Sequence, residues 1–303
     1  MFGYGFFLYD VLNKFIKICE KKKDSKTAEE FSKIKEELRR NLNTKGWDGR
    51  WYKRAIMDDG TQIGSLESKE CKIDGISQSW SVISGAGDND KKYISMQEAE
   101  NNLVDRENKL IKLFTPAFQS WEINPGYIKA YPEGIRENGG QYTHGAIWMI
   151  IACCLLGFGD KAVEFLKLIN PIEHSKTFDS AKKYRLEPYV IAADIYNNPN
   201  NRGVGGWSWY TGSSSWYYDA VVEYVLGLKI ENRYLYLEPC IASDWKEYEL
   251  HYRYKTSMYN ITVKNPDGKN AGVKKFLVND LEIPEKKILL QDDGKIYNIE
   301  IIM

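Results

Sequence analysis

The stretch YTHGAIWMIIACCLL, residues 142 to 156, decides the fold of the surrounding chain because it is apolar almost all round. A helix at a protein surface shows a polar face about every 3.6 residues, and this run shows none from Ala146 to Ile151. It is also shorter than the roughly 18 residues that a membrane-spanning helix needs. We therefore predict a helix that is buried on most sides in a protein core.

Amphipathic helices are predicted on both sides of this run. Residues 6 to 19 repeat apolar side chains at helical spacing, and Asp24 or Ser25 can cap a second helix that completes a helical hairpin. Helical spacing returns in further segments: 75–85, 95–105, 160–170, 187–195 and 213–226. Helices that alternate between amphipathic and nearly all-apolar favour two concentric layers. We expect a mainly α fold of the α/α barrel type, with a pocket built by loops at one end.

The hydrophobic period changes after Gly227. Tyr248, Leu250 and Tyr252 alternate with polar residues, and the turn signals NPDG and QDDG separate such segments. We predict a helical domain over residues 1–227 and a small, β-sandwich-like C-terminal domain over residues 228–303.

Composition limits the partners. Lys plus Arg and Asp plus Glu both number 42, which removes the electrostatic case for nucleic acid or an anionic membrane. Five cysteines without a CxxC pair, no signal peptide and no apolar run of membrane-spanning length favour a cytoplasmic protein. Aromatic residues make up 14% of the chain, which is typical of sugar-binding proteins but also fits a large core with amphipathic residues around it.

The first chemical candidate is IRENGGQYTHGAIW, residues 135 to 148. Arg136, Glu137 and His144 surround two glycines just before the apolar helix, so these side chains are expected on a loop at the mouth of the pocket. A histidine and an arginine at a helix start suit a phosphate. Alternatively, His144 is a cap or core residue, and Arg136 with Glu137 is a solvated pair. The chain has only three histidines, far apart, so we expect no metal site.

The second candidate is GGWSWYTGSSSWYY, residues 205 to 218. Thr211, Gly212 and the serines after them offer hydroxyl and backbone N–H groups at the start of a predicted helix, again favourable for an anion, with tryptophans on either side. Alternatively, this is an ordinary helix cap with tryptophan packing. Taken together, the two candidates favour a phosphate held beside a sugar.

At these residues the chain resembles the C-terminal half of glycoside hydrolase family 94, which holds the inverting β-glucoside phosphorylases and the C-terminal region of cyclic β-1,2-glucan synthases. The resemblance implies an (α/α)6 barrel, here only in part, followed by a short β domain. It implies β-linked gluco-oligosaccharides or glucans as substrates, inorganic phosphate as co-substrate, and no cofactor. Seven ordered runs carry it: WDGRWYKRA, DDGTQIGS, ECKIDGISQSW, PGYIKAYPEGIRENGGQYTHGA, RLEPYVIAADIY, GGWSWYTGSSSWYY and LEPCIASDW.

By this resemblance, three residues match positions that hold phosphate: His144, Thr211 and Gly212. Two residues match positions that line the sugar subsites near the scissile bond: Arg136 and Glu137. Tyr131 is expected on the acceptor side.

The chain departs from the family at the general acid, an aspartate in a DWND-type motif before the helix that YGFFLYDVLNKF matches. No DWND occurs in this sequence. We therefore expect a fragment of a phosphorylase that carries the phosphate side, lacks the acid and depends on an N-terminal half-chain. Two alternatives stay open: a catalytically inactive carbohydrate-binding remnant or subunit of a split enzyme, and a hydrolase that uses Asp74 or Glu67 as acid. The linkage of the substrate is not determined by this sequence.

Overall fold

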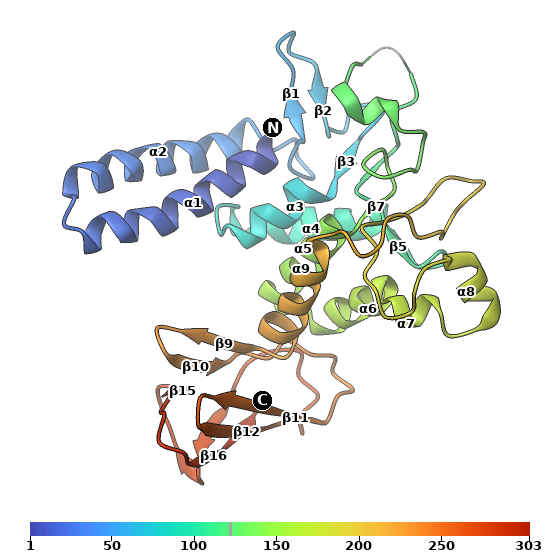
Figure 1. The fold of residues 1–303 in the computed structure, drawn as a ribbon. Coiled ribbons are helices and arrows are strands. Elements are labelled where there is room, and N and C mark those ends of the chain that lie inside the picture. Colours follow the sequence, from blue (N-terminus) through green and yellow to red (C-terminus); the bar gives the residue numbers. More distant parts are fainter. Residues whose placement is uncertain (121–122) are drawn as a thin grey trace. The chain divides into compact units, whose positions relative to one another are not determined.

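The computed structural model describes residues 1–120 and 123–303 (Figure 1). Two compact units divide the chain: Met1–Ala152 with Lys167–Ser214, and Cys153–Leu166 with Ser215–Met303. The described helices are α1 (Phe2–Lys21), α2 (Ser25–Thr44), α3 (Gly75–Ile83), α4 (Asn89–Leu103), α5 (Thr143–Leu155), α6 (Gly159–Ile169), α7 (Pro171–His174), α8 (Phe178–Tyr184) and α9 (Ser213–Asp219), with a 3-10 helix η1 (Gly126–Ala130) and a π-helix η2 (Ala220–Val225). The chain is thus mainly helical before Leu228.

The predicted helical hairpin is confirmed. Helices α1 and α2 lie side by side (Figure 1), and Asp24 caps α2 by accepting a hydrogen bond from the backbone N–H of Thr27 at 3.2 Å. Phe6 of α1 and Leu42 of α2 belong to one buried cluster with Tyr52. The hairpin is therefore joined to the unit through the base of both helices.

Helix α5 confirms the prediction of a helix buried on most sides. Ile147, Ile150 and Ile151 are completely buried, and only near the end of the helix is a large apolar side chain, that of Leu155, exposed. Because each buried aliphatic side chain adds about 1.5–3 kcal/mol of stabilisation, this helix contributes strongly to folding.

The prediction of a helix over residues 187–195 is wrong. These residues run irregularly into strand β8 (Asp194–Ile195), because their backbone groups pair with β7 (Gln141–Tyr142) and with residues 204–207. Helices α7 and α8 were not predicted. The helix expected over 213–226 is present but changes at Ala220 from α9 to the π-helix η2.

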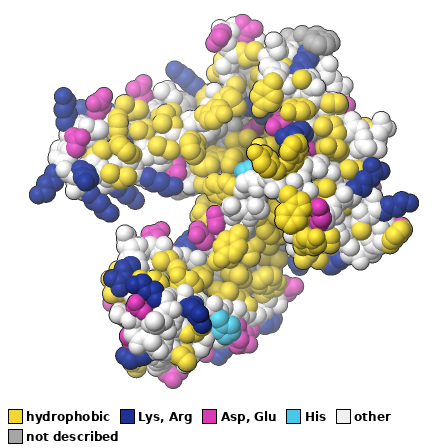
Figure 2. Space-filling view, viewed as in Figure 1, with side chains coloured by type: hydrophobic (Ala, Val, Ile, Leu, Met, Phe, Trp, Pro, Cys, Tyr) yellow, Lys and Arg dark blue, Asp and Glu magenta, His cyan; other side chains and the backbone are white. Residues whose placement is uncertain are grey.

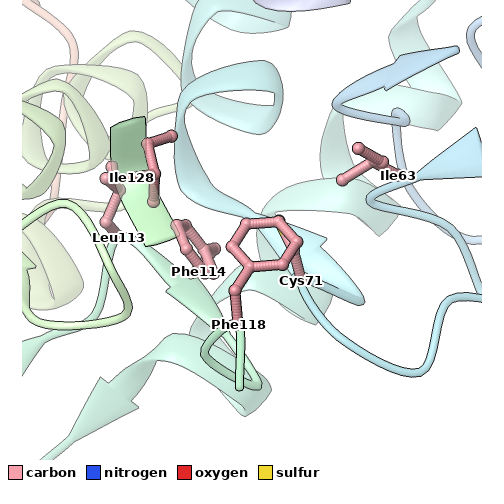
Figure 3. Close-up of a cluster of buried hydrophobic side chains, with 6 residues drawn as sticks. All are labelled: Ile63, Cys71, Leu113, Phe114, Phe118 and Ile128. Carbon is pink, nitrogen blue, oxygen red and sulfur yellow. The ribbon is translucent and has the colours of Figure 1, made fainter. Parts of the chain in front are cut away.

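A buried hydrophobic cluster supports the loops of the first unit (Figure 3). Strand β3 (Ile73–Asp74) pairs with β6 (Phe114–Thr115), and the rings of Phe114 and Phe118 meet edge to face at 5.2 Å. The close-up shows these rings beside one another with Cys71 next to them; the buried cluster also includes Leu113, Ile128 and Ile63. Two more short antiparallel strand pairs lie in this unit: β1 (Ala55–Ile56) with β2 (Gln62–Ile63), and β4 (Val104–Asp105) with β5 (Leu110–Ile111).

The second unit contains the predicted β segments. Strands β11 (Glu247–Tyr254), β12 (Ser257–Lys264), β16 (Ile296–Ile302), β13 (Lys275–Val278) and β14 (Leu281–Glu282) form one sheet in this order, in which β12 and β16 are parallel. A second sheet has the order β15 (Lys287–Leu289), β10 (Tyr234–Leu237), β9 (Leu228–Glu231). Tyr259, Ile261 and Val263 are buried on one side of β12, as the alternation predicts. Among the described residues, no helix is long and apolar enough to cross a membrane.

His174 is a buried histidine outside the predicted candidates. Its ring stacks on that of Tyr184 with 4.8 Å between the centroids, and its Nε2 lies 2.8 Å from the carbonyl oxygen of Leu168. Burial lowers the pKa of His174 to about 4, so the ring is neutral in the folded protein at neutral pH.

We predict that this histidine makes folding sensitive to acid. Its folded pKa lies below the unfolded value, so the unfolded chain binds the extra proton, and stability falls as the pH falls from about 6.5 to about 4, by at most roughly 3 kcal/mol. Chemical denaturation across this range should show a shallower loss for His174→Phe than for the wild type. The exposed His251→Phe is the control, and identical pH profiles for wild type and His174→Phe would contradict the account.

Candidate active site

Three short backbone segments hold the site together: β7, β8 and residues 204–207. Strands β7 and β8 pair so that Tyr142 lies opposite Asp194. On the other side of β8, the N–H of Ala193 donates to the oxygen of Trp207 at 2.7 Å, and the N–H of Gly206 donates to the oxygen of Asp194 at 2.9 Å. The residues just before α5 and the residues just before α9 are therefore tied to the same central segment.

The two loops singled out in the sequence meet at His144 and Gly212. A methyl group placed on Gly212 would lie 3.5 Å from Nε2 of His144, so this nitrogen faces the glycine backbone across a space that holds no side chain. The His144 ring stacks on Tyr142 with 5.5 Å between the centroids. Burial lowers the pKa of His144, so the ring is neutral at neutral pH and donates one N–H.

Thr211 lies next to this space and also serves as a cap. Its Oγ1 accepts a hydrogen bond from the backbone N–H of Ser213 at 3.1 Å, and it shares a second bond of 2.7 Å with the Ser213 hydroxyl. The capping alternative is correct to this extent. When Ser213 donates in the shared bond, the proton of Thr211 is available to a third group.

Arg136 and Glu137 lie together in the loop before β7. Nε of Arg136 is 3.6 Å from Oε2 of Glu137, beyond hydrogen-bond distance, and both atoms are buried without a hydrogen-bond partner among the described residues. The guanidinium lies over the rings of Tyr131 and Trp207, at 5.6 and 6.0 Å from their centroids. The two side chains form a partly exposed ion pair, 34% and 17% exposed, in which these two atoms are shielded from water.

The loop that carries this pair is held by Asn138. Its side-chain oxygen accepts from the N–H of Phe118 at 2.8 Å, and its side-chain nitrogen donates to the oxygens of Phe118 and Tyr131 at 3.0 and 2.8 Å. Arg136 adopts a φ of +47°, a backbone conformation that is uncommon for a residue with a side chain. The completely buried Asn138 thus fixes the loop in which that conformation occurs.

Asp194 is a site residue that the sequence analysis missed. It is 2% exposed, its Oδ1 accepts from the N–H of Trp207 at 3.2 Å, and its Oδ2 has no hydrogen-bond partner in the described part of the chain. A methyl group on Gly206 would lie 2.5 Å from Oδ1, so the chain passes this carboxylate closely. Burial raises the pKa of Asp194, with the charge of Glu137 adding to the rise and Arg136 opposing it.

Tyr142 connects the two groups of candidates. Its ring stacks on His144, and its own pKa is raised by burial and then by the negative charge of Glu137. The structure therefore brings His144 and Gly212 together and brings Arg136 and Glu137 together, with the guanidinium over the rings of Tyr131 and Trp207. Tyr142 stacks on His144 and senses the charge of Glu137.

The chemistry of the site follows from its unpartnered atoms. Buried polar atoms are hydrogen-bonded in more than about nine cases in ten, so three such exceptions in one region are unusual. One is a donor, Nε of Arg136, and two are acceptors, Oε2 of Glu137 and Oδ2 of Asp194. A ligand with several hydroxyl groups would satisfy all three, and the backbone of Gly212 lies close to Nε2 of His144.

Comparisons with known proteins identify the family of this chain. The model of the glycosyl hydrolase 94 superfamily, catalytic domain, matches residues 3–227, and the chain therefore belongs to this family. The cyclic beta-(1,2)-glucan synthase NdvB of Rhizobium meliloti is 40% identical over 259 residues, which are 86% of this chain and 9% of that protein. The solabiose phosphorylase of Paenibacillus borealis is 28% identical over 98% of this chain and 38% of its own length.

Two further comparisons concern relatives and fold. The N,N'-diacetylchitobiose phosphorylase of Vibrio furnissii is 27% identical over 91% of this chain and 34% of its own length. A solved structure named as a sialidase covers 82% of this chain and 22% of its own, with a TM-score of 0.52 and 12% identity, which indicates a likeness of fold alone. The chain thus spans less than two fifths of the length of each of these relatives.

Proposed function

We propose that this chain forms the phosphate-binding side of an inverting β-glucoside or β-glucan phosphorylase. The observation that carries the proposal is the approach of Gly212 to Nε2 of His144, next to the three unpartnered polar atoms of Arg136, Glu137 and Asp194. One region thus offers a space for an anion and, beside it, a set of hydrogen-bonding atoms for a sugar ring.

In this proposal, phosphate binds between the two loops. The neutral ring of His144 donates one N–H, the backbone of Gly212 lies exposed opposite it, and the hydroxyl of Thr211 supplies a third contact. Among the described residues, only the His144 ring lies within 4 Å of the position of a Cβ on Gly212, so a tetrahedral oxyanion can approach the glycine backbone closely. Inorganic phosphate is then a co-substrate, and the reaction uses no metal or organic cofactor.

The glucosyl ring binds next to the phosphate. Glu137 and Asp194 accept hydrogen bonds from sugar hydroxyls, and Arg136 donates one, which satisfies the buried atoms that have no protein partner. Tyr131, whose ring lies beneath the Arg136 guanidinium, lines the acceptor side. The substrate is a β-linked gluco-oligosaccharide or glucan.

The proposed reaction needs only one protein acid. Phosphate is already an anionic nucleophile, so no carboxylate is needed to activate water. A phosphate oxygen forms a bond to the anomeric carbon on one face, while the bond to the glycosidic oxygen breaks on the other. An acid gives its proton to the departing oxygen, and the product is α-glucose 1-phosphate with inverted configuration.

We further propose that this acid comes from a separate stretch of polypeptide, an N-terminal half-chain. Asp74 gives the hydrolase alternative no support: its Oδ1 accepts from the N–H groups of Ile76 and Ser77 at 2.9 and 3.1 Å, and its Oδ2 pairs with Arg54. The carboxylate is thus a helix cap and a partner in a buried ion pair. Together with its partner, the chain would form the (α/α)6 barrel, with residues 1–227 as its second half and 228–303 as a separate β domain.

The exposed face of α1 supports a partner chain. Its outer side carries large apolar residues at helical spacing that are 41–69% exposed: Tyr4, Phe7, Leu8, Val11, Phe15 and Ile18. Figure 2 shows hydrophobic side chains along this hairpin, with Lys and Arg side chains around its far end. A continuous apolar stripe on a surface marks an interaction site, and the longer relatives contain the additional polypeptide that could cover it.

We predict that His144→Ala weakens phosphate binding about tenfold or more, because the loss of one hydrogen bond to a charged group costs roughly 1.5–3 kcal/mol. Gly212→Ala should weaken it as well, because the new methyl group would lie 3.5 Å from Nε2 of His144 and narrow the space for the anion. Calorimetric titration with inorganic phosphate measures both effects. The control is the exposed His251→Ala on β11.

The same variants test the function when the chain is combined with an N-terminal half-chain. Phosphate release from α-glucose 1-phosphate with a gluco-oligosaccharide acceptor should require both parts and fall in His144→Ala. Unchanged phosphate affinity and activity in His144→Ala would remove this residue from the site. Sugar binding that ignores phosphate would instead support the catalytically inactive carbohydrate-binding alternative.

We also predict that the double substitution Leu8→Lys and Ile18→Lys reduces self-association of the isolated chain and prevents assembly with an N-terminal half-chain, because two charges would have to be buried against the partner. Light scattering and co-purification measure the two effects. Glu20→Lys on the same helix, outside the apolar stripe, is the charge-matched control. Assembly that survives the double substitution would show that this face is not the contact.

A further inference from the structure

Large aromatic side chains gather at the surface next to the candidate site. Trp209 and Tyr189 are 70% and 73% exposed, and their rings meet edge to face with 6.2 Å between centroids. Tyr210 is 82% exposed and lies 6.0 Å from Trp207. Side chains of this size gain stability by burial, so their exposure in one place indicates a surface that is covered by a ligand.

Trp209 is fixed in this exposed position. Its backbone has a φ of +64°, a conformation that residues with a side chain adopt at a cost in free energy. Its indole Nε1 donates a hydrogen bond of 2.9 Å to Oε1 of Glu187. A conformation of this kind is kept only when the surroundings hold it, and such residues gather at binding sites.

Glu187 brings a hydrogen-bond acceptor to the same place. Its Oε2 is shielded from solvent, and the Ser208 side chain interacts with the same carboxylate. The pKa of Glu187 is lowered by its own backbone N–H and then by Trp209, so the carboxylate is charged at neutral pH. An exposed ring beside a carboxylate matches a pyranose, whose C–H face stacks on the ring while a hydroxyl donates to a carboxylate oxygen. The negative charge disfavours a phosphorylated or acidic sugar.

The aromatic pair belongs to the same chain segment as the candidate site. Trp207, two residues before Trp209, lies 6.0 Å from the guanidinium of Arg136, and Thr211 follows two residues after it. Trp209 therefore lies two residues along the chain from each of two residues of the candidate site, Trp207 and Thr211.

We propose that Trp209, Tyr189 and Glu187 form a distal subsite that binds a neutral glucosyl unit of a β-linked gluco-oligosaccharide. This inference rests on the proposed function, since it extends the same site. The subsite makes longer oligosaccharides better ligands than disaccharides, because only the longer chains reach the aromatic pair.

The test compares chain lengths in the absence of phosphate, by calorimetric titration of the chain with sophorose and sophorotetraose and with cellobiose and cellotetraose. Wild type should bind at least one tetrasaccharide more tightly than the matching disaccharide. Trp209→Ala should lower the affinity for that tetrasaccharide about tenfold and leave the affinity for the disaccharide unchanged. Trp209→Phe should restore most of the affinity, and Phe178→Ala, which removes a side chain 82% exposed on α8, is the control.

The outcomes are separate from those of the phosphate test. Three results would overturn the distal subsite. They are equal affinity of the wild type for both chain lengths, no binding of a tetrasaccharide, and tetrasaccharide binding that Trp209→Ala leaves unchanged. Circular dichroism and thermal melting of each variant exclude unfolding as the cause of a loss. Failure of phosphate binding would overturn the proposed function while leaving a length-dependent sugar affinity intact.

Discussion

The backbone hydrogen bonds of residues 193–196 are the constraint on which the candidate site depends. This segment lies between β7 and residues 204–207 and pairs with both. Its pairing with β7 fixes where α5 begins, and therefore where His144 lies. Its pairing with residues 204–207 fixes the path of the chain toward Gly212. His144 lies in the first turn of the buried helix α5, whereas Gly212 lies in the loop before α9, and the central segment is bonded to the chain near both.

Polar atoms distinguish the structural part of this unit from its candidate site. Around Asp74 and Asn138, buried polar side chains find partners within the chain. At Arg136, Glu137 and Asp194, one atom of each side chain has none in the described part of the chain. Leaving such an atom unpaired costs roughly 1–3 kcal/mol, and a fold accepts this cost where a ligand supplies the missing bond.

Much of the fold could be predicted because it is encoded locally. The all-apolar run from Ala146 to Ile151, the Asp24 cap and the alternation along β12 each report a structure that depends on nearby residues. The failure at residues 187–195 has the opposite origin. That segment has helical spacing, but its backbone pairs with segments about 50 residues earlier and about ten residues later in the chain, and no local pattern reports such pairing.

The candidate site shows the same division. The loops around His144 and Thr211 could be recognised from residue types, and the structure brings His144 and Gly212 together. Asp194 and Tyr142 were missed, because each gains its importance from a neighbour distant in sequence. A carboxylate inside the otherwise apolar stretch YVIAADIY was the one available signal for Asp194. The family resemblance implied roles for single residues. Which polar atoms lack partners depends on the three-dimensional structure.

The most direct test is the NMR spectrum of the histidine rings during titration with inorganic phosphate, which is simple because the chain has only three histidines. The account predicts saturable shifts of the His144 resonances and a rise in its pKa, because a bound anion favours the protonated ring. His174 and His251 should not respond. If His144 is unaffected by phosphate, or if all three rings respond alike, the proposal that phosphate binds between His144 and Gly212 is wrong.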